Sequence, residues 1–316
     1  MDESTNHLRG AAKFLQICHP SEICSTALGL SLLDWFAHYE DCLVSLGKEE
    51  AVLDHTWRER RKYVQDESPD HGFNGLQAQF RTLSMDGNRL IMRMSRILRT
   101  SNIAEGAEAL PCLEMEGKEL IKKILDFMAS PKLSVFEIRP SNSSQRLGDS
   151  PDSPSCVSVS KFPEAGFLRL ACISYNCVIS SKLSRILYLI GRCQRWQQYR
   201  IQAYQYCEDF VETFDTVERG FENKCSSMLP ALDLLLVVSA CAPYSKQIRD
   251  WFLKMIGNVA TEGYTIDAEF EKKLKKEWED LDNMKNDSVY GRCKCCLGQL
   301  DLGRSYETAG IEAGAQ

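Results

Sequence analysis

The chain has 316 residues, of which 44% are hydrophobic and 26% charged, and its formal net charge is −6. This length and balance are typical of a folded protein with a sizeable core. The acidic charge argues against a protein that holds duplex DNA by itself, because phosphate neutralisation needs a basic face. The polar start, Met1–Asn6, predicts that there is no secretory signal.

Apolar residues recur at helical spacing along nearly the whole chain. In chain order, the predicted helices lie around residues 28–46, 83–98, 120–128, 183–190, 196–214, 234–238, 248–259 and 270–281. The run Leu234–Val238 is the most apolar of them and too short to span a bilayer, so we interpret it as part of a core helix. Strand-like alternation is weak and confined to Leu133–Ile138. The sequence therefore predicts an all-α fold, an irregular multi-helix bundle or array.

One segment interrupts this pattern. From about 139 to 164 serine, proline and aspartate dominate, which predicts a disordered or mobile insertion between helices. The expected organisation is one helical domain over 1–285, interrupted by this insertion, and a flexible cysteine-containing tail over 286–316.

The fourteen cysteines indicate a reducing compartment. Six of them stand inside apolar helical patterns: Cys42, Cys172, Cys177, Cys193, Cys207 and Cys241. A cysteine in such a position behaves as a small buried hydrophobe. We therefore expect reduced thiols in a cytosolic or nuclear compartment.

Motifs that carry catalysis are absent from the sequence. It has no His-Glu-x-x-His pair, no Gly-x-Ser-x-Gly elbow, no phosphate-binding Gly-x-x-x-x-Gly-Lys-Ser/Thr loop and no Gly-x-Gly-x-x-Gly turn. We therefore predict no catalytic residue, no cofactor and no enzymatic activity. A helical enzyme of a class without these motifs is the alternative that the sequence leaves open.

Two groups of residues have the chemistry of metal ligands. Cys293, Cys295 and Cys296 bring three thiols together and are weak metal candidates, because a closed zinc site normally has four ligands. The competing interpretation is an exposed, redox-sensitive tail. His38 and Cys42 stand four residues apart, which favours a packed pair on one helix face over a metal site.

Three blocks of sequence carry a family resemblance. The first is His7–Ala11, and the second is Leu32–Glu40, followed by Val52, Leu53 and Trp57. The third runs from Tyr206–Phe210 through Ala240–Pro243 and Trp251 to Glu262–Tyr264, Phe270 and Trp278. In this order the blocks resemble the helical regulatory region of fungal binuclear zinc-cluster transcription factors.

The resemblance implies a nuclear regulator of transcription that often controls a metabolic gene set, such as one of secondary metabolism. It implies protein partners, as a homodimer or as a heterodimer with zinc-cluster regulators, and allows a small-molecule effector between the helices. The family's DNA-binding element, with six cysteines and a basic stretch, does not occur in the sequence. We therefore expect DNA to be reached only indirectly, unless a segment encoding that element precedes Met1. A dimerisation module without direct DNA binding remains the alternative.

Overall fold

The computed structural model describes most of the chain after residue 72. The described residues are 73–134, 137–138, 159–160, 163–220, 229–241, 245–261 and 268–289, together with single positions between 10 and 36. Within them the predicted all-α class is confirmed. The helices are α5 (Phe73–Thr100), α6 (Ile103–Met128), α7 (Pro131–Ser134), α8 (Pro163–Leu189), α9 (Cys193–Gly220), α11 (Leu229–Ser239), α12 (Lys246–Thr261) and α13 (Ala268–Val289).

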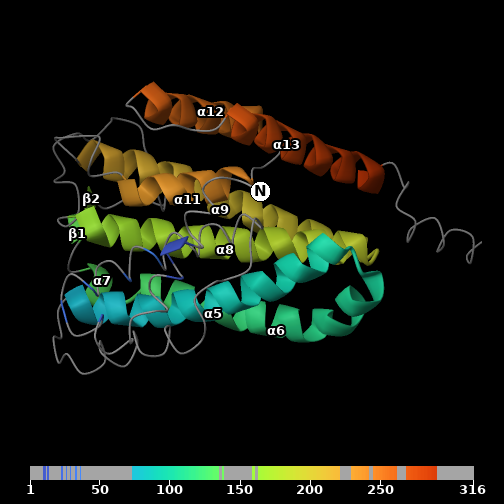
Figure 1. The fold of residues 1–316 in the computed structure, drawn as a ribbon, viewed down its shortest axis with the longest axis horizontal. Coiled ribbons are helices and arrows are strands. Elements are labelled where there is room, and N and C mark those ends of the chain that lie inside the picture. The colour runs from blue at the N-terminus through green and yellow to red at the C-terminus, as the bar shows by residue number, and fades with distance from the viewer. Residues whose placement is uncertain are drawn as a thin grey trace, which may run out of the picture.

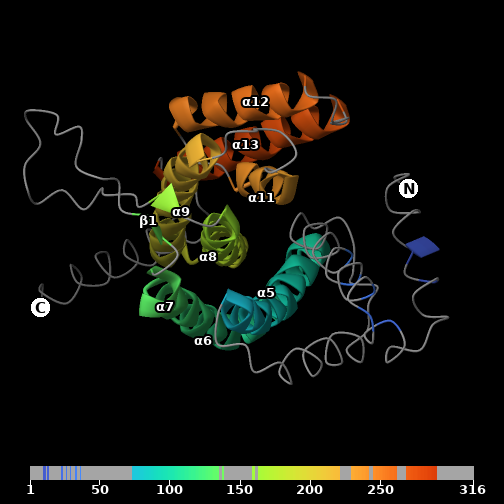
Figure 2. The same cartoon turned by 90° about the vertical axis from the view of Figure 1, so that its left-hand side faces the viewer.

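The helices form an irregular array around α8, which lies at the centre (Figure 1). Seen nearly along its axis, α8 has α5 and α6 on one side, α9 and α11 on the other, and α12 and α13 beyond them (Figure 2). Its sequence fits this position, because apolar and small side chains occur all round the helix. Its buried residues include Leu170, Cys172, Cys177, Ile179, Leu183, Ile186 and Leu187.

Local sequence signals set the turn after α8 and the start of α6. Gly191 follows α8 with φ 77°, a conformation that glycine adopts without a steric penalty. The amide of Arg192 donates to the carbonyl of Leu187 at 2.8 Å, which closes a Schellman turn and sends α9 back along α8. At the start of α6, Asn102 accepts a hydrogen bond from the amide of Glu105 at 3.1 Å and caps the helix.

The layer of α5 and α6 buries the apolar residues that the spacing predicted. Leu90, Ile91, Met94 and Ile97 of α5 are all at most 2% exposed. On its polar face α5 pairs with α6 through arginines, for example Arg96 with Glu105 at 2.8 Å. α5 also approaches α8 closely at Gly87, where an added Cβ would lie 2.7 Å from the ring of Tyr175. The hydroxyl of Tyr175 donates to Asn88 at 3.0 Å, which holds that ring in place.

The core-helix interpretation of Leu234–Val238 is confirmed, because α11 buries Leu234, Leu235, Val237 and Val238. Among the described helices, none has the length and apolar character that crossing a membrane requires.

The region of weak alternation divides between a helix and a strand. Pro131 begins the short helix α7, which contains Leu133, because proline is well tolerated in a first helical turn. Only Glu137–Ile138 forms a strand, β1, and it pairs in antiparallel register with Val159–Ser160, β2. Two such short strands leave the all-α class unchanged.

Two boundaries expected from the sequence, those of the insertion and of the C-terminal tail, can be compared with the described residues. β2 and the first two residues of α8 fall within the expected insertion of about 139–164, and the rest of it lies outside the described residues. α13 continues to Val289, so its last turn extends into the expected tail, and residues 290–316 are not described.

Candidate functional site

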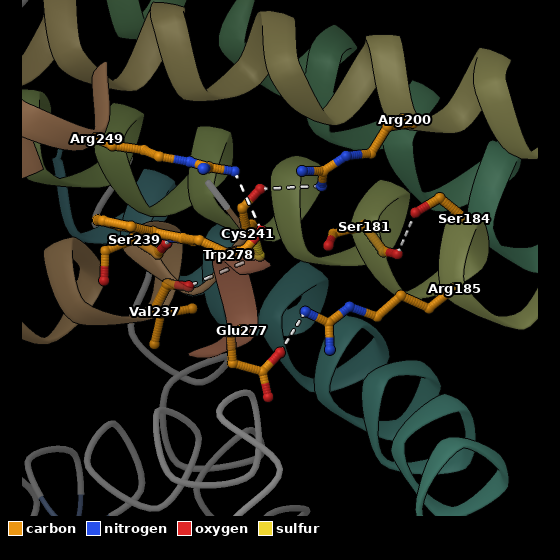
Figure 3. A network of polar contacts seen from close by, with 10 residues as sticks. All are labelled: Ser181, Ser184, Arg185, Arg200, Val237, Ser239, Cys241, Arg249, Glu277 and Trp278. Atoms are coloured by element: carbon orange, nitrogen blue, oxygen red, sulfur yellow. Dashed lines mark hydrogen bonds and ion pairs between the residues drawn. The ribbon is translucent and has the colours of Figure 1, made fainter. Parts of the chain in front are cut away.

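A group of polar contacts between helices lies where α11 ends. A helix leaves its last carbonyls without partners inside the helix. Here the carbonyl of Ser239 accepts a hydrogen bond from Nε1 of Trp278 at 2.9 Å, and the carbonyl of Cys241 accepts one from Nη1 of Arg200 at 3.3 Å (Figure 3). An arginine suits the negative end of a helix dipole. We call Arg200, Ser239, Cys241, Arg249 and Trp278 the α11 junction.

The α11 junction holds α13 against the rest of the array. The guanidinium of Arg249, in α12, lies 5.3 Å from the centre of the Trp278 ring (Figure 3). The same guanidinium donates to both carboxylate oxygens of Asp282, at 2.7 and 2.9 Å. One turn away, Arg185 of α8 pairs with Glu277 at 2.6 Å. Trp278, Asp282 and Glu277 all belong to α13, so this helix is fixed by one buried ring and two ion pairs.

Aromatic rings pack α12 onto α9. The ring of Phe210 stacks on that of Phe252 with centroids 6.4 Å apart, and the ring of Phe214 meets Trp251 edge-on at 5.5 Å. Nε1 of Trp251 donates to Asp215 at 3.2 Å, which satisfies its one polar atom. These rings fill the interface between the two helices and form part of the core.

Three buried thiols lie at the α11 junction. One comes from α8, one from α9, and the third is that of Cys241, just after α11. The sulfurs of Cys177 and Cys207 are 3.4 Å apart. The Cys207 thiol points at the carbonyl of Cys241 at 3.9 Å. We call Cys177, Cys207 and Cys241 the thiol cluster. The prediction that these three residues are buried is confirmed, as it is for Cys172.

Hydrogen bonds and nearby charges give Cys177 and Cys241 of the thiol cluster different pKa values. Hydrogen bonds with Cys207 and Cys241, together with burial, raise the pKa of Cys177 well above its ordinary value. A hydrogen bond from Cys177 lowers the pKa of Cys241 to about 7, with Arg185 and Lys182 adding to the effect and burial opposing it. Burial in turn lowers the pKa of Lys182 to about 8. Cys241 is therefore more acidic than Cys177, and the nearby Lys182 contributes to this difference.

α8 also buries a polar residue, Asn176, whose side chain forms no hydrogen bond with the described residues. Asn176 is 0% exposed, and neither its amide nitrogen nor its amide oxygen has a hydrogen-bond partner among the described residues. Burying an amide in this way costs stability. We have no functional account of Asn176.

The metal candidates Cys293, Cys295 and Cys296 lie outside the described residues, as do His38 and Cys42. Within the described ranges, no group of three or more potential ligands is arranged to hold a metal ion.

The sequence analysis did not single out Arg200 or Lys182. Arg200 is 2% exposed and lies on the apolar face of α9, four residues after Trp196. A charged residue in phase with a buried stripe is the sequence signal that points to Arg200.

The third block of the family resemblance gathers at the α11 junction and the thiol cluster. Cys207, Cys241 and Trp278 of the block lie there, whereas Phe210 and Trp251, which also belong to it, pack in the interface of α9 and α12. Residues 242–244 and 262–267 of this block lie outside the described residues. Of the second block, Leu33 and Phe36 are described and buried, at 1% and 3% exposed.

Comparison with known proteins adds no relative. No protein-family model matches the chain, no curated protein matches it, and no solved structure matches it.

Proposed function

We propose that this chain is a transcription regulator that resembles the fungal zinc-cluster family and acts through its helical regulatory region. In this proposal it works in the nucleus, controls a metabolic gene set, and reaches DNA only through protein partners. The partners are a second copy of the chain or a zinc-cluster regulator that carries its own DNA-binding element. The proposal assigns contact, and no reaction, to the helical array.

The observation that carries the proposal is the spatial gathering of the third block. Cys207 and Cys241 belong to this block and are far apart in the sequence, yet the Cys207 thiol donates to the Cys241 carbonyl. Trp278, a third member, donates to the carbonyl of Ser239, which directly precedes Ala240–Pro243 of the block. Their shared location supports treating the block as one structural unit, as the resemblance implies.

The charges of this junction also support a regulatory role. Arg185 and Arg249 hold the carboxylates of α13 through side chains that are partly exposed. Partly exposed ion pairs contribute little stability, so the buried ring of Trp278 holds α13 more strongly than its two ion pairs do. In this proposal the ion pairs are the contacts of α13 that an effector or a partner changes.

Tethering tests the proposal directly. The full chain is fused to a heterologous DNA-binding domain, and transcription of a reporter is compared with that of the DNA-binding domain alone. We expect a several-fold change in either direction. Trp278→Ala, which breaks the α11 junction, should abolish the change, and Lys275→Ala, an exposed position of the same helix, should preserve it.

Deletion of the gene followed by transcript profiling supplies the second measurement. The expected result is a coordinated change in a set of metabolic genes, with the fluorescent full-length chain concentrated in the nucleus. A tethered chain equal to the DNA-binding domain alone, together with unchanged transcripts after deletion, would refute the proposal.

The proposal also predicts that the chain forms a dimer, with itself or with a complete zinc-cluster regulator. Light scattering of the purified full chain, alone and mixed with a complete zinc-cluster regulator, should show a dimer in at least one of the two samples. A strict monomer in both would remove the dimer and heterodimer partners, leaving other proteins as the contacts.

A further inference from the structure

The thiol cluster has a geometry that its packing role does not require. Cys177 and Cys207 point their sulfurs at each other across the interface of α8 and α9, at van der Waals distance. Both side chains are 0% exposed. The thiol of Cys177 also approaches the carbonyl of Ala203 at 3.6 Å, so the two helices come close at this level.

The antiparallel course of the two helices fixes this pairing. The Schellman turn at Gly191 joins α8 directly to α9, and Cys177 and Cys207 are 30 positions apart on its two arms. A disulfide bond is about 2.0 Å long. Closing the gap from 3.4 Å requires a movement of about 1.4 Å, which side-chain rotation together with a small helix shift supplies.

We propose that Cys177 and Cys207 are an oxidation site, where a hydroperoxide converts the two thiols into a reversible disulfide that fastens α8 to α9. Each thiol loses its proton, and one sulfur–sulfur bond forms. The hydroperoxide accepts the two electrons and two protons, its oxygen–oxygen bond breaks, and it leaves as one water and one alcohol, or as two waters when the oxidant is hydrogen peroxide. A small dithiol reverses the step.

Cys112 and Cys172 lack this arrangement, and Cys241 is the third member of the thiol cluster. Cys112 is exposed and donates to Glu116, without a second sulfur in contact. The Cys241 thiol also forms a hydrogen bond with Cys177, but it donates to the carbonyl of Val237 at 3.7 Å, and the sulfur–sulfur contact of 3.4 Å is the one between Cys177 and Cys207. Cys172 is buried in α8, five positions before Cys177, and forms no sulfur–sulfur contact among the described residues. Cys172 is therefore a matched control.

Peptide mapping tests the inference. The purified full chain is treated with hydrogen peroxide, unfolded, alkylated at its remaining thiols and cut with trypsin without reduction. Cleavage after Arg169 and Lys182 releases peptide 170–182, which carries Cys172 and Cys177, and cleavage after Arg200 and Arg219 releases peptide 201–219, which carries Cys207. We expect these two peptides as one linked species that separates on reduction.

Variants identify the thiol within the first peptide. Cys172→Ala should leave the linked species in place, and Cys177→Ala or Cys207→Ala should remove it. Full alkylation of both peptides after oxidation would overturn the inference, and so would a link through Cys172 or Cys241. Circular dichroism of each variant before oxidation checks that it has folded.

A measurement on the unsubstituted chain does not depend on the variants. A cross-link between the two arms of the hairpin restricts the unfolded chain, so oxidation should raise the melting temperature, and reduction should restore it. Because both thiols are buried, the rise should develop more slowly than the modification of the exposed Cys112. An oxidised chain that melts at the temperature of the reduced chain would contradict the fastening of α8 to α9.

Discussion

Trp278 provides the sharpest test of how α13 is held. Its side chain is 5% exposed, its Nε1 donates to the carbonyl of Ser239 at 2.9 Å, and Arg249 lies over its ring. A buried tryptophan removes roughly 200 Å² from water, worth about 5 kcal/mol at about 25 cal/mol per Å². The hydrogen bond adds about 1 kcal/mol and the cation–π contact about 0.5–1 kcal/mol.

Trp278→Ala should therefore lower the free energy of unfolding by about 3–5 kcal/mol, because part of the surface is regained by relaxation around the cavity. Trp278→Phe keeps most of the apolar area and loses the hydrogen bond to Ser239, so about 1–2 kcal/mol is expected. The control is Lys275→Ala, an exposed position of α13, which should stay within about 0.5 kcal/mol of the unsubstituted chain.

Urea unfolding followed by far-ultraviolet circular dichroism measures these differences, provided that the transition is cooperative. Hydrogen exchange of the α13 amides separates global destabilisation from local detachment of this helix. The reasoning is wrong if Trp278→Ala lies within about 1 kcal/mol of the unsubstituted chain and the α13 amides keep their protection.

Three further substitutions probe α8 and its neighbours by the same urea assay. Asn176→Ala removes one buried side-chain amide whose nitrogen and oxygen both lack partners among the described residues, and it should raise the free energy of unfolding by about 1 kcal/mol; a loss would reveal a partner for the amide. Gly87→Val drives a branched side chain into the ring of Tyr175 and should cost about 2 kcal/mol or more, whereas little or no loss would mean that α5 and α8 can move apart. The pKa of Lys182 is about 8 in the folded chain and has its ordinary value of 10.5 in the unfolded chain, so the unfolded chain binds more protons between these pH values. The free energy of unfolding should therefore rise with pH across that window, by about 1–2 kcal/mol after allowance for the partial exposure of this side chain. Lys182→Met should remove this rise, and parallel pH profiles of the variant and the unsubstituted chain would refute the assignment.

Periodicity predicts the described helices well because it depends only on local spacing. The buried stripe of α5 and the core helix α11 follow from the positions of leucine, isoleucine and valine. The short helix α7 was missed because its leucine and valine neighbours alternate like a strand, whereas Pro131 favours a helix start.

The site was less predictable, because its contacts join distant segments. The sequence indicated that Cys207 and Cys241 are buried, but not that one points at the other's carbonyl. The burial of Arg200 depends on the carbonyl at the end of α11, which only the folded chain brings to it. The weak metal candidates and the first family block lie mainly in residues that are not described, and they stay predictions.

The central position of α8 affects the order in which the chain matures on the ribosome. α5 and α6 are synthesised before α8, which begins at Pro163 and packs against both of them. Until α8 emerges, the apolar surface that it will bury is exposed, and such transiently exposed surface is prone to aggregation. Once α8 is complete, the tight turn at Gly191 brings α9 onto it by a short-range contact, and assembly proceeds quickly from that hairpin.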